Sequence, residues 1–214
     1  MEFKIYKPFG PEILEAKIPD QILNEINEYI DKLINDEAKS KEQNYGKFLA
    51  GDVSQEFKLD QEFAKKIGWL DFLGKCTYEY VLKATGSKIT TCQVIETWVV
   101  RQYKNEYNPI HWHGGHISGA GFLKVPKTLG TFVQDKGDKP YKGGILNLIH
   151  GSRQFLSHSI FQIKPKVGNF YLFPNYMMHT VYPFRGTDDE RRSISFNANI
   201  DSSIYNVYGG YVKK

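Results

Sequence analysis

The second half of the chain is the feature that most constrains its fold. From Lys88 onward the sequence consists of short runs rich in β-branched and aromatic residues, separated by Gly, Pro, Asn and Asp. Seven such runs within about 120 residues are typical of an antiparallel sandwich or barrel. We expect the strands to lie in ITTCQVIETWVVRQY, ISGAGFLKV, GGILNLIH, SIFQIK, NFYLF, HTVYPF and RSISFNANI.

The preceding part of the chain predicts helices. Apolar residues recur at helical spacing between Ile22 and Ile34, and Asp20 is a plausible N-cap for this helix. A second helical stretch runs from about Asp60 to Ala84 and should stop at Thr85-Gly86. The segment FKIYKPF near the start is expected to be a strand, and SSIYNVYGGYVKK at the end a strand or a tail.

No linker separates these two parts, so we expect one domain over residues 1–214. Residues 1–87 would form a helical region that covers one sheet, and residues 88–205 would form the β core. The amphipathic helices could equally bury against a second copy of the chain. The oligomeric state, including a dimer, therefore stays open.

Composition and charge indicate which partners and which cellular compartment to expect. The net charge of +4 is modest for 214 residues, and the lysines are scattered, which disfavours nucleic acid as the main partner. The longest apolar run is far below the ~20 residues that span a bilayer, so no membrane is expected. The first twenty residues lack the apolar centre of a signal peptide. Because Cys76 and Cys92 form no disulfide framework, we expect a cytoplasmic protein with reduced thiols.

Three of the six histidines lie within NPIHWHGGH. His111 and His113 are two residues apart, so on an extended strand both rings point to the same side and can reach one metal ion. His179 is the best candidate for a third ligand from a distant strand. His116 is expected to be a loop residue, a support for a ligand or a substrate contact. A lone histidine is more often structural, as we expect for the other two, His150 and His158.

The run ERRSISFNA, whose Arg191 lies twelve residues after His179, offers a site for an anion. On a strand, Arg191, Ser193 and Ser195 share one face, and a guanidinium with a hydroxyl can clamp a carboxylate. An inward Arg191 would need an anionic partner, because an unpaired buried charge is costly. The competing interpretation is a solvated charged turn over residues 188–192.

Taken together, these motifs resemble the Fe(II)/2-oxoglutarate-dependent oxygenase superfamily. The similar segments span about residues 95–200, in the order and spacing of that superfamily. Within it, the chain is also similar to a branch of 2OG-Fe(II) oxygenases in which a His-x-His motif precedes Ser-Gly, as in HWHGGHISGAGF. The segments that carry the resemblance are VVRQYKNEYNPIHWH, KGGILNL, KPKVGNFYLFPNYMMHTVYPF and RRSIS.

The resemblance implies an α+β, mainly β fold, a double-stranded β-helix (jelly roll) with the N-terminal helices packed on one sheet. It implies an oxidoreductase that uses Fe(II) and 2-oxoglutarate, releases succinate and CO2 and hydroxylates an unidentified small molecule or peptide. His111 matches the first metal ligand and His179 the distal one. Arg191 and Ser193 match the pair that holds the far carboxylate of 2-oxoglutarate, and Tyr103 lies near a tyrosine that touches this cosubstrate in some members. No catalytic residue beyond the metal centre is implied.

One departure from the family pattern matters, because His113 occupies the position expected to hold Asp or Glu. We favour His111, His113 and His179 as the ligands, since facial sites of three histidines bind Fe(II) in other oxygenases. Two alternatives stay open: a carboxylate from elsewhere completes the site, or His113 turns away and leaves the position that halide-using relatives exploit. The alternative functions are a three-histidine cupin-type dioxygenase without 2-oxoglutarate and a non-catalytic jelly-roll binding protein.

Overall fold

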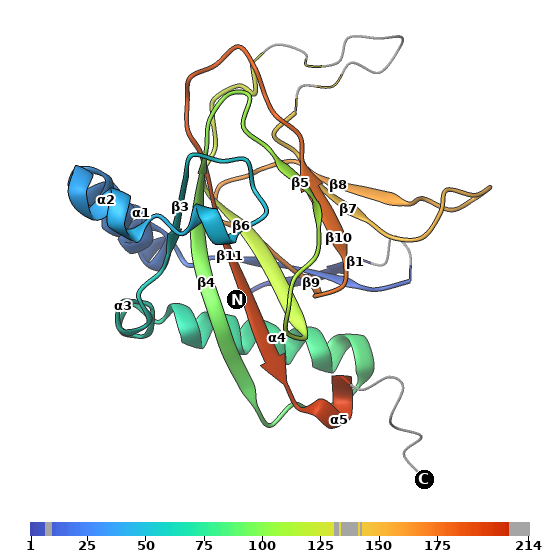
Figure 1. Ribbon diagram of the computed structural model, residues 1–214. Coiled ribbons are helices and arrows are strands. Elements are labelled where there is room, and N and C mark those ends of the chain that lie inside the picture. The colour runs from blue at the N-terminus through green and yellow to red at the C-terminus, as the bar shows by residue number, and fades with distance from the viewer. Residues whose placement is uncertain (7–9, 131–132, 134–140, 142, 206–214) are drawn as a thin grey trace.

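Two antiparallel sheets dominate the structure, a computed structural model that describes residues 1–6, 10–130, 133, 141 and 143–205 (Figure 1). The larger sheet has the strand order β1-β2-β9-β6-β11-β4-β3, and the smaller has the order β5-β10-β7-β8. The strands are β1 (Phe3–Tyr6), β2 (Ile13–Lys17), β3 (Gln55–Lys58), β4 (Cys92–Gln102), β5 (Asn108–His111), β6 (Ile117–Lys124), β7 (Leu146–Ile149), β8 (Ile160–Ile163), β9 (Asn169–Pro174), β10 (Met178–Val181) and β11 (Arg191–Ile200).

Helices cover one face of the larger sheet, where α4 crosses its strands (Figure 1). Apolar residues of α1 and α4 share one core with Val99 of β4, Phe170 of β9 and Ile194 of β11. The helices are α1 (Asp20–Ile34), α2 (Glu37–Gln43), α3 (Gln61–Lys66), α4 (Trp69–Thr85) and α5 (Ser202–Tyr205), with a 3-10 turn, η1, at Gly46–Phe48. In the part of the chain that the structure describes, no helix combines the length and apolarity that crossing a membrane requires.

A second core lies between the two sheets. Phe122 of β6 and Phe173 of β9 face Leu148 of β7 and Val181 of β10 there. Each strand of the larger sheet therefore sends alternate side chains toward the helices and toward the smaller sheet, as the two-residue period of a strand requires. The space between the sheets is where functional side chains can gather.

Most of the predicted elements are confirmed, with local corrections. Each of the seven predicted runs contains a strand, the strand near the start is β1, and α1 covers residues 20–34. Asp20 is not the N-cap: it is the first helical residue, and Pro19 precedes it without a side-chain hydrogen bond. The second helical stretch is two helices, because Gly68 adopts a φ of 77° between α3 and α4, whereas Gly86 ends α4 as expected.

The sequence prediction missed β2, β3 and β5. The first two lie among residues 1–87 and pair with β9 and β4 of the larger sheet, so this region supplies strands as well as helices. The last segment, SSIYNVYGGYVKK, begins with the helix α5, whereas a strand or a tail was expected. Residues 206–214 of that segment lie outside the described residues.

A buried charge network joins α1 to the sheet. Arg192 has a fully buried side chain that donates to the carboxylates of Glu190 and Asp31 and to the backbone carbonyl of Asn27. Glu190 also accepts two hydrogen bonds from Arg101. Arg192 is therefore part of the packing, and the alternative of a solvated turn over residues 188–192 is wrong for this residue.

We expect Glu190→Gln to lower the free energy of unfolding by about 3–5 kcal/mol, because it leaves buried arginine charges short of their partner. Burial alone would raise the pKa of Glu190, but the hydrogen bonds from Arg101 and Arg192 outweigh it and lower this pKa. The contribution should therefore be complete above the unfolded-state pKa of about 4.3 and fade as the pH falls below it. Urea unfolding at pH 7 and pH 3.5 measures both effects. The exposed neighbour Asp189 provides the control, Asp189→Asn, and an equal loss in both variants would contradict the network.

Candidate metal centre

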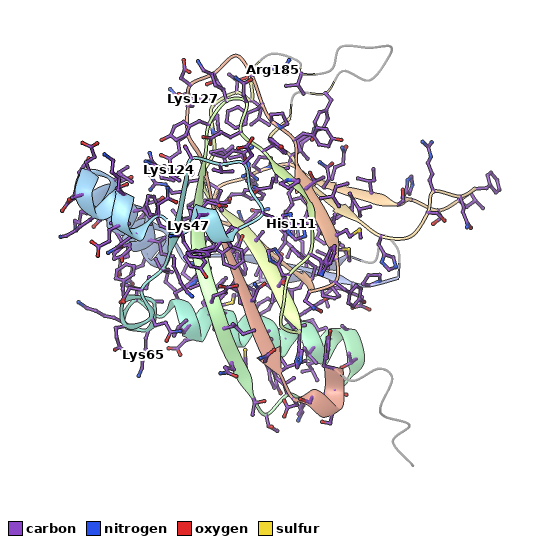
Figure 2. The ribbon with its side chains drawn as sticks, viewed as in Figure 1. Lys47, Lys65, His111, Lys124, Lys127 and Arg185 are labelled. Carbon is purple, nitrogen blue, oxygen red and sulfur yellow. The ribbon has the colours of Figure 1, made fainter. Side chains whose placement is uncertain are left out.

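Three histidines converge at the edge of the smaller sheet where β5 and β10 pair. His111 ends β5 and lies directly opposite His179 in the antiparallel register. His113 follows two residues after the end of β5, and its ring lies against that of His179, with 3.0 Å between their Nε2 atoms. The candidate ligand atoms of all three lie within 4.8 Å of one another. Figure 2 shows His111 within the body of the molecule.

The backbone fixes the orientation of two of these rings. Nδ1 of His111 lies 2.7 Å from the carbonyl oxygen of Pro109, and Nδ1 of His179 lies 2.9 Å from that of Met177. A carbonyl only accepts, so each Nδ1 carries the proton and donates it. Each Nε2 therefore keeps a free lone pair, the arrangement usual for a histidine that binds a metal ion.

The connection after β5 holds the third ring. The backbone N–H of His113 donates to the carbonyl of Asn175, and the Asn175 side chain donates back to the carbonyl of His113, at 3.1 and 3.2 Å. The indole of Trp98 packs against the His113 ring with 5.4 Å between centroids. His113 therefore turns into the cluster, as the three-histidine hypothesis expects, although β5 itself ends before it.

All three imidazoles are held in their neutral form. Burial lowers the pKa of His113 to about 4, with a further effect from His111. Burial also lowers the pKa of His179 to about 3, and it lowers the pKa of His111. Neutral imidazole is the form that binds a metal ion, so the cluster is ready to do so at neutral pH. Among the described residues, no Asp or Glu belongs to the cluster, which disfavours the alternative of a carboxylate ligand from elsewhere.

The remaining histidines lie outside the cluster. The ring of His116 stacks on Tyr205 with 3.9 Å between centroids, and its Nδ1 accepts a hydrogen bond from the backbone N–H of Ile200. His116 thus attaches α5 to the end of β11, a role that its position in HWHGGH alone did not distinguish from a loop residue, a support for a ligand or a substrate contact. His150 and His158 lie in the connection between β7 and β8, away from the three clustered histidines.

Arg191 is a buried cation in the same interior. It is 2% exposed, and its guanidinium donates to three neutral oxygens: the Gly144 carbonyl, the Gln102 side chain and the Ser193 hydroxyl, at 3.0, 3.2 and 3.4 Å. Burial lowers its pKa to about 10, so it stays charged at neutral pH. No carboxylate pairs with it among the residues that the structure describes. An isolated buried charge is costly, so this arrangement favours an anionic ligand.

A single cavity of about 300 Å³ joins the histidine cluster to Arg191 and Ser193. Tyr103 is not part of its lining, because the tyrosine hydroxyl lies against the guanidinium of Arg101 instead. The structure therefore brings together five of the six residues selected from the sequence and leaves Tyr103 outside.

Sequence reasoning missed two carboxyl groups in this lining, Glu56 and Glu96. The alternation of Glu96 with Trp98 along β4 was a usable signal for one of them. Glu56 lies in a strand that the sequence prediction lacked.

Fold and site together define a protein of two β-sheets in which three histidines that could hold a metal ion lie beside the buried guanidinium of Arg191. Residues 96–197 match the family model described as "Putative 2OG-Fe(II) oxygenase", and this segment includes all five of the assembled residues. The matched segment, a little under half of the chain, is similar to the 2OG-Fe(II) oxygenases. The match and the histidine cluster mark the chain as an oxidoreductase, a dioxygenase whose cofactor is Fe(II) and whose cosubstrate is 2-oxoglutarate.

Solved structures support the fold. A prolyl-4-hydroxylase from Pseudomonas putida is 12% identical, with a TM-score of 0.53 over 86% of this chain and 91% of its own. The viral collagen prolyl hydroxylase of Paramecium bursaria Chlorella virus-1 is 16% identical, with a TM-score of 0.53 over 86% of this chain and 94% of its own. A 2OG-Fe(II) oxygenase family protein from Burkholderia pseudomallei is 13% identical, with a TM-score of 0.51 over 86% and 84%. No curated protein matches the sequence.

We expect His113→Ala and His179→Ala to weaken Mn(II) or Fe(II) binding by more than about 100-fold. The loss should exceed the 10–100-fold that removal of a mere supporting partner causes. His116→Ala is the matched control from the same sequence run, and it should keep the affinity of the unmodified protein. Isothermal titration with Mn(II) measures all three. Unchanged binding in His113→Ala would show that His113 is not a ligand.

Proposed function

We propose that this 2OG-Fe(II) oxygenase hydroxylates its substrate and releases succinate and CO2, with His111, His113 and His179 holding the iron. Arg191 and Ser193 would hold the far carboxylate of 2-oxoglutarate. The observation that carries this proposal is the buried guanidinium of Arg191, which lacks a carboxylate partner among the described residues and shares one cavity with the histidine cluster.

We further assign the two sheets to a double-stranded β-helix. The smaller sheet contributes His111 and His179, and β11 in the larger sheet contributes Arg191 and Ser193. The cavity lies between the sheets, as the mixture of lining residues from both supports. In such a fold the metal ion and the cosubstrate bind between two rigid sheets, which limits movement of the reacting groups.

The donor set fits the assigned groups. Three neutral imidazoles suit Fe(II), and a guanidinium with an adjacent hydroxyl suits a carboxylate. When bound, Fe(II) supplies the activation of dioxygen that couples decarboxylation of 2-oxoglutarate to oxidation of the substrate. The backbone acceptors at Pro109 and Met177 orient the ligand rings, and Gln102 and Gly144 orient Arg191.

Apolar side chains complete the cavity near Arg191. Phe122, Leu146 and Val181 line it, and the Phe122 ring lies 5.2 Å from the centre of the guanidinium. These side chains exclude water, which strengthens the interaction between Arg191 and a bound carboxylate. We assign no proton donor or acceptor of the chain to this chemistry. Its contribution is to bind, orient and exclude water.

Anaerobic titration of the Fe(II) protein with 2-oxoglutarate tests the proposal. We expect a weak visible charge-transfer band from the iron-chelated oxoacid. Arg191→Ala should weaken 2-oxoglutarate binding by more than about 100-fold, because removal of one partner of a buried ion pair typically costs about 3–5 kcal/mol. Exposed Arg153 offers the control Arg153→Ala. Melting temperatures establish that each variant is folded.

Two results would overturn the proposal in different ways. Iron binding without the band would favour a three-histidine dioxygenase that does not use 2-oxoglutarate. Absence of iron binding would favour a non-catalytic binding protein and would contradict the assignment of the three histidines.

A further inference from the structure

Carboxyl groups lie in the cavity on the side away from Arg191. Apart from the histidines, the charged residues of its lining are Arg191 on β11, Glu56 on β3 and Glu96 on β4. Glu56 pairs with Val100 in the β3–β4 register, and Val100 pairs with Ser193 of β11. Glu56 therefore lies two strands away from Ser193, or roughly 10 Å across the sheet. The acidic groups and the site for the cosubstrate carboxylate occupy different parts of one cavity.

Glu56 has no partner within the described chain that explains its burial. It is 1% exposed, and its Oε2 atom has no hydrogen-bond partner. No lysine or arginine forms an ion pair with it among the described residues. Burial, with a smaller effect from Glu106, raises the pKa of its carboxyl to about 8, so Glu56 holds a proton at neutral pH and would give it up when a cation binds beside it. A buried polar atom without a partner is destabilising, so a ligand that supplied the missing donor would bind more tightly for doing so.

The segment around Gly51 packs against one side of Glu56. A Cβ atom on Gly51 would lie 2.3 Å from Oδ1 of Asn108 and 3.2 Å from Oε1 of Glu56. The segment is held in this place by paired backbone hydrogen bonds between Asp52 and Tyr107. No room exists there for an additional side chain of the protein. Because Glu56 also lines the cavity, a ligand bound there can supply the missing donor.

The second carboxyl group is positioned but only weakly compensated. The amide of Asn197 donates to Oε1 of Glu96 at 3.2 Å. The ammonium of Lys58 lies 3.9 Å from Oε2, at the limit of an ion pair, and Lys58 is not part of the cavity lining. Such a partly exposed pair contributes little, because solvent screens the two charges. No close ion pair therefore neutralises Glu96 among the described residues, and a cation in the cavity can interact with its carboxylate.

Aromatic side chains accompany the carboxyl groups. Trp98 of β4 is buried in the lining, whereas Trp112 and Phe48 are each 63% exposed and also line the cavity. The faces of aromatic rings attract cations, and exposed aromatic residues beside carboxylates are typical of sites for ammonium and guanidinium groups. A neutral or anionic substrate would leave the Glu96 carboxylate and these faces without a matching charge and the buried Glu56 carboxyl without a donor.

We infer that the primary substrate carries a cationic nitrogen, an ammonium or guanidinium group as on lysine or arginine, that binds between the Glu56 and Glu96 carboxylates. The inference rests on the proposed function, because it assigns Arg191 to 2-oxoglutarate and leaves the acidic part of the cavity to the substrate. The prolyl hydroxylases of similar fold are named for proline, which has no side-chain charge. This chain is accordingly expected to select a different residue or molecule.

The test uses the full chain with Mn(II) in the metal site and 2-oxoglutarate present. The probes are Nα-acetyl-lysine N-methylamide and its neutral Nε-acetyl isostere, and the readout is the relaxation of their proton NMR signals by the bound Mn(II). We expect the cationic probe to bind at least about tenfold more tightly, as for a hydrogen bond to a charged group. Glu56→Gln should reduce this preference to less than about twofold, and Glu96→Gln should reduce it in part.

Glu28→Gln is the matched control, because Glu28 is an exposed carboxylate on α1 outside the cavity. It should keep the full preference, and melting temperatures check the fold of every variant. The arginine analogue, Nα-acetyl-arginine N-methylamide, distinguishes the two cations: the tighter binder identifies the substrate group.

The result that overturns the inference is equal relaxation of the cationic and neutral probes, or a preference that Glu56→Gln leaves unchanged. The protons of 2-oxoglutarate in the same sample report separately on the proposed function. If Mn(II) relaxes 2-oxoglutarate but does not distinguish the probes, only the substrate inference fails. If 2-oxoglutarate itself is not relaxed, the proposed function fails and the inference with it.

Discussion

Two adjacent buried arginines at the start of β11 set the two faces of the larger sheet. Because successive side chains of a strand point to opposite sides, Arg192 faces the helices while Arg191 faces the smaller sheet. Arg192 finds Glu190 and Asp31 and joins α1 to the sheet. Arg191 finds only neutral oxygens among the described residues. The same charge thus stabilises the fold on one face and prepares a binding site on the other, since a buried cation is tolerated only when its environment supplies compensating groups.

The arrangement of the three histidines depends on both regular strand pairing and irregular backbone. The pairing of β5 with β10 places His111 opposite His179, and this part of the geometry follows from strand register alone. His113 lies beyond the end of β5, where reciprocal hydrogen bonds with Asn175 hold its backbone. A carboxylate at this position would add a negative charge to the centre. With the imidazole of His113 there, the three neutral histidines together carry no charge.

The sequence predicted what depends on local composition and on the two-residue period, and it missed what depends on pairing between distant segments. The strands from β6 onward are short apolar runs bounded by turn residues, so their positions were readable. β5 contains Pro109 and β3 reads QEFK, and neither has a strong strand propensity of its own. The alternation along β11 predicted the inward face that carries Arg191. The Glu56 carboxyl was not predictable, because only the pairing of β3 with β4 brings it over the cavity.

Formal charge connects these features. With neutral histidines, a divalent iron and a doubly charged 2-oxoglutarate cancel, so the charge that a substrate meets is set by the side chains of the cavity. When Glu56 and Glu96 are both ionised, their two negative charges and the positive charge of Arg191 sum to a net charge of about minus one. A single bound cation restores neutrality, and its attraction to the carboxylate offsets the desolvation cost that raises the pKa of Glu56. Under the proposed assignment the metal ion is held without a protein carboxylate, and the two acidic groups of the cavity, which lie outside the histidine cluster, remain for the substrate.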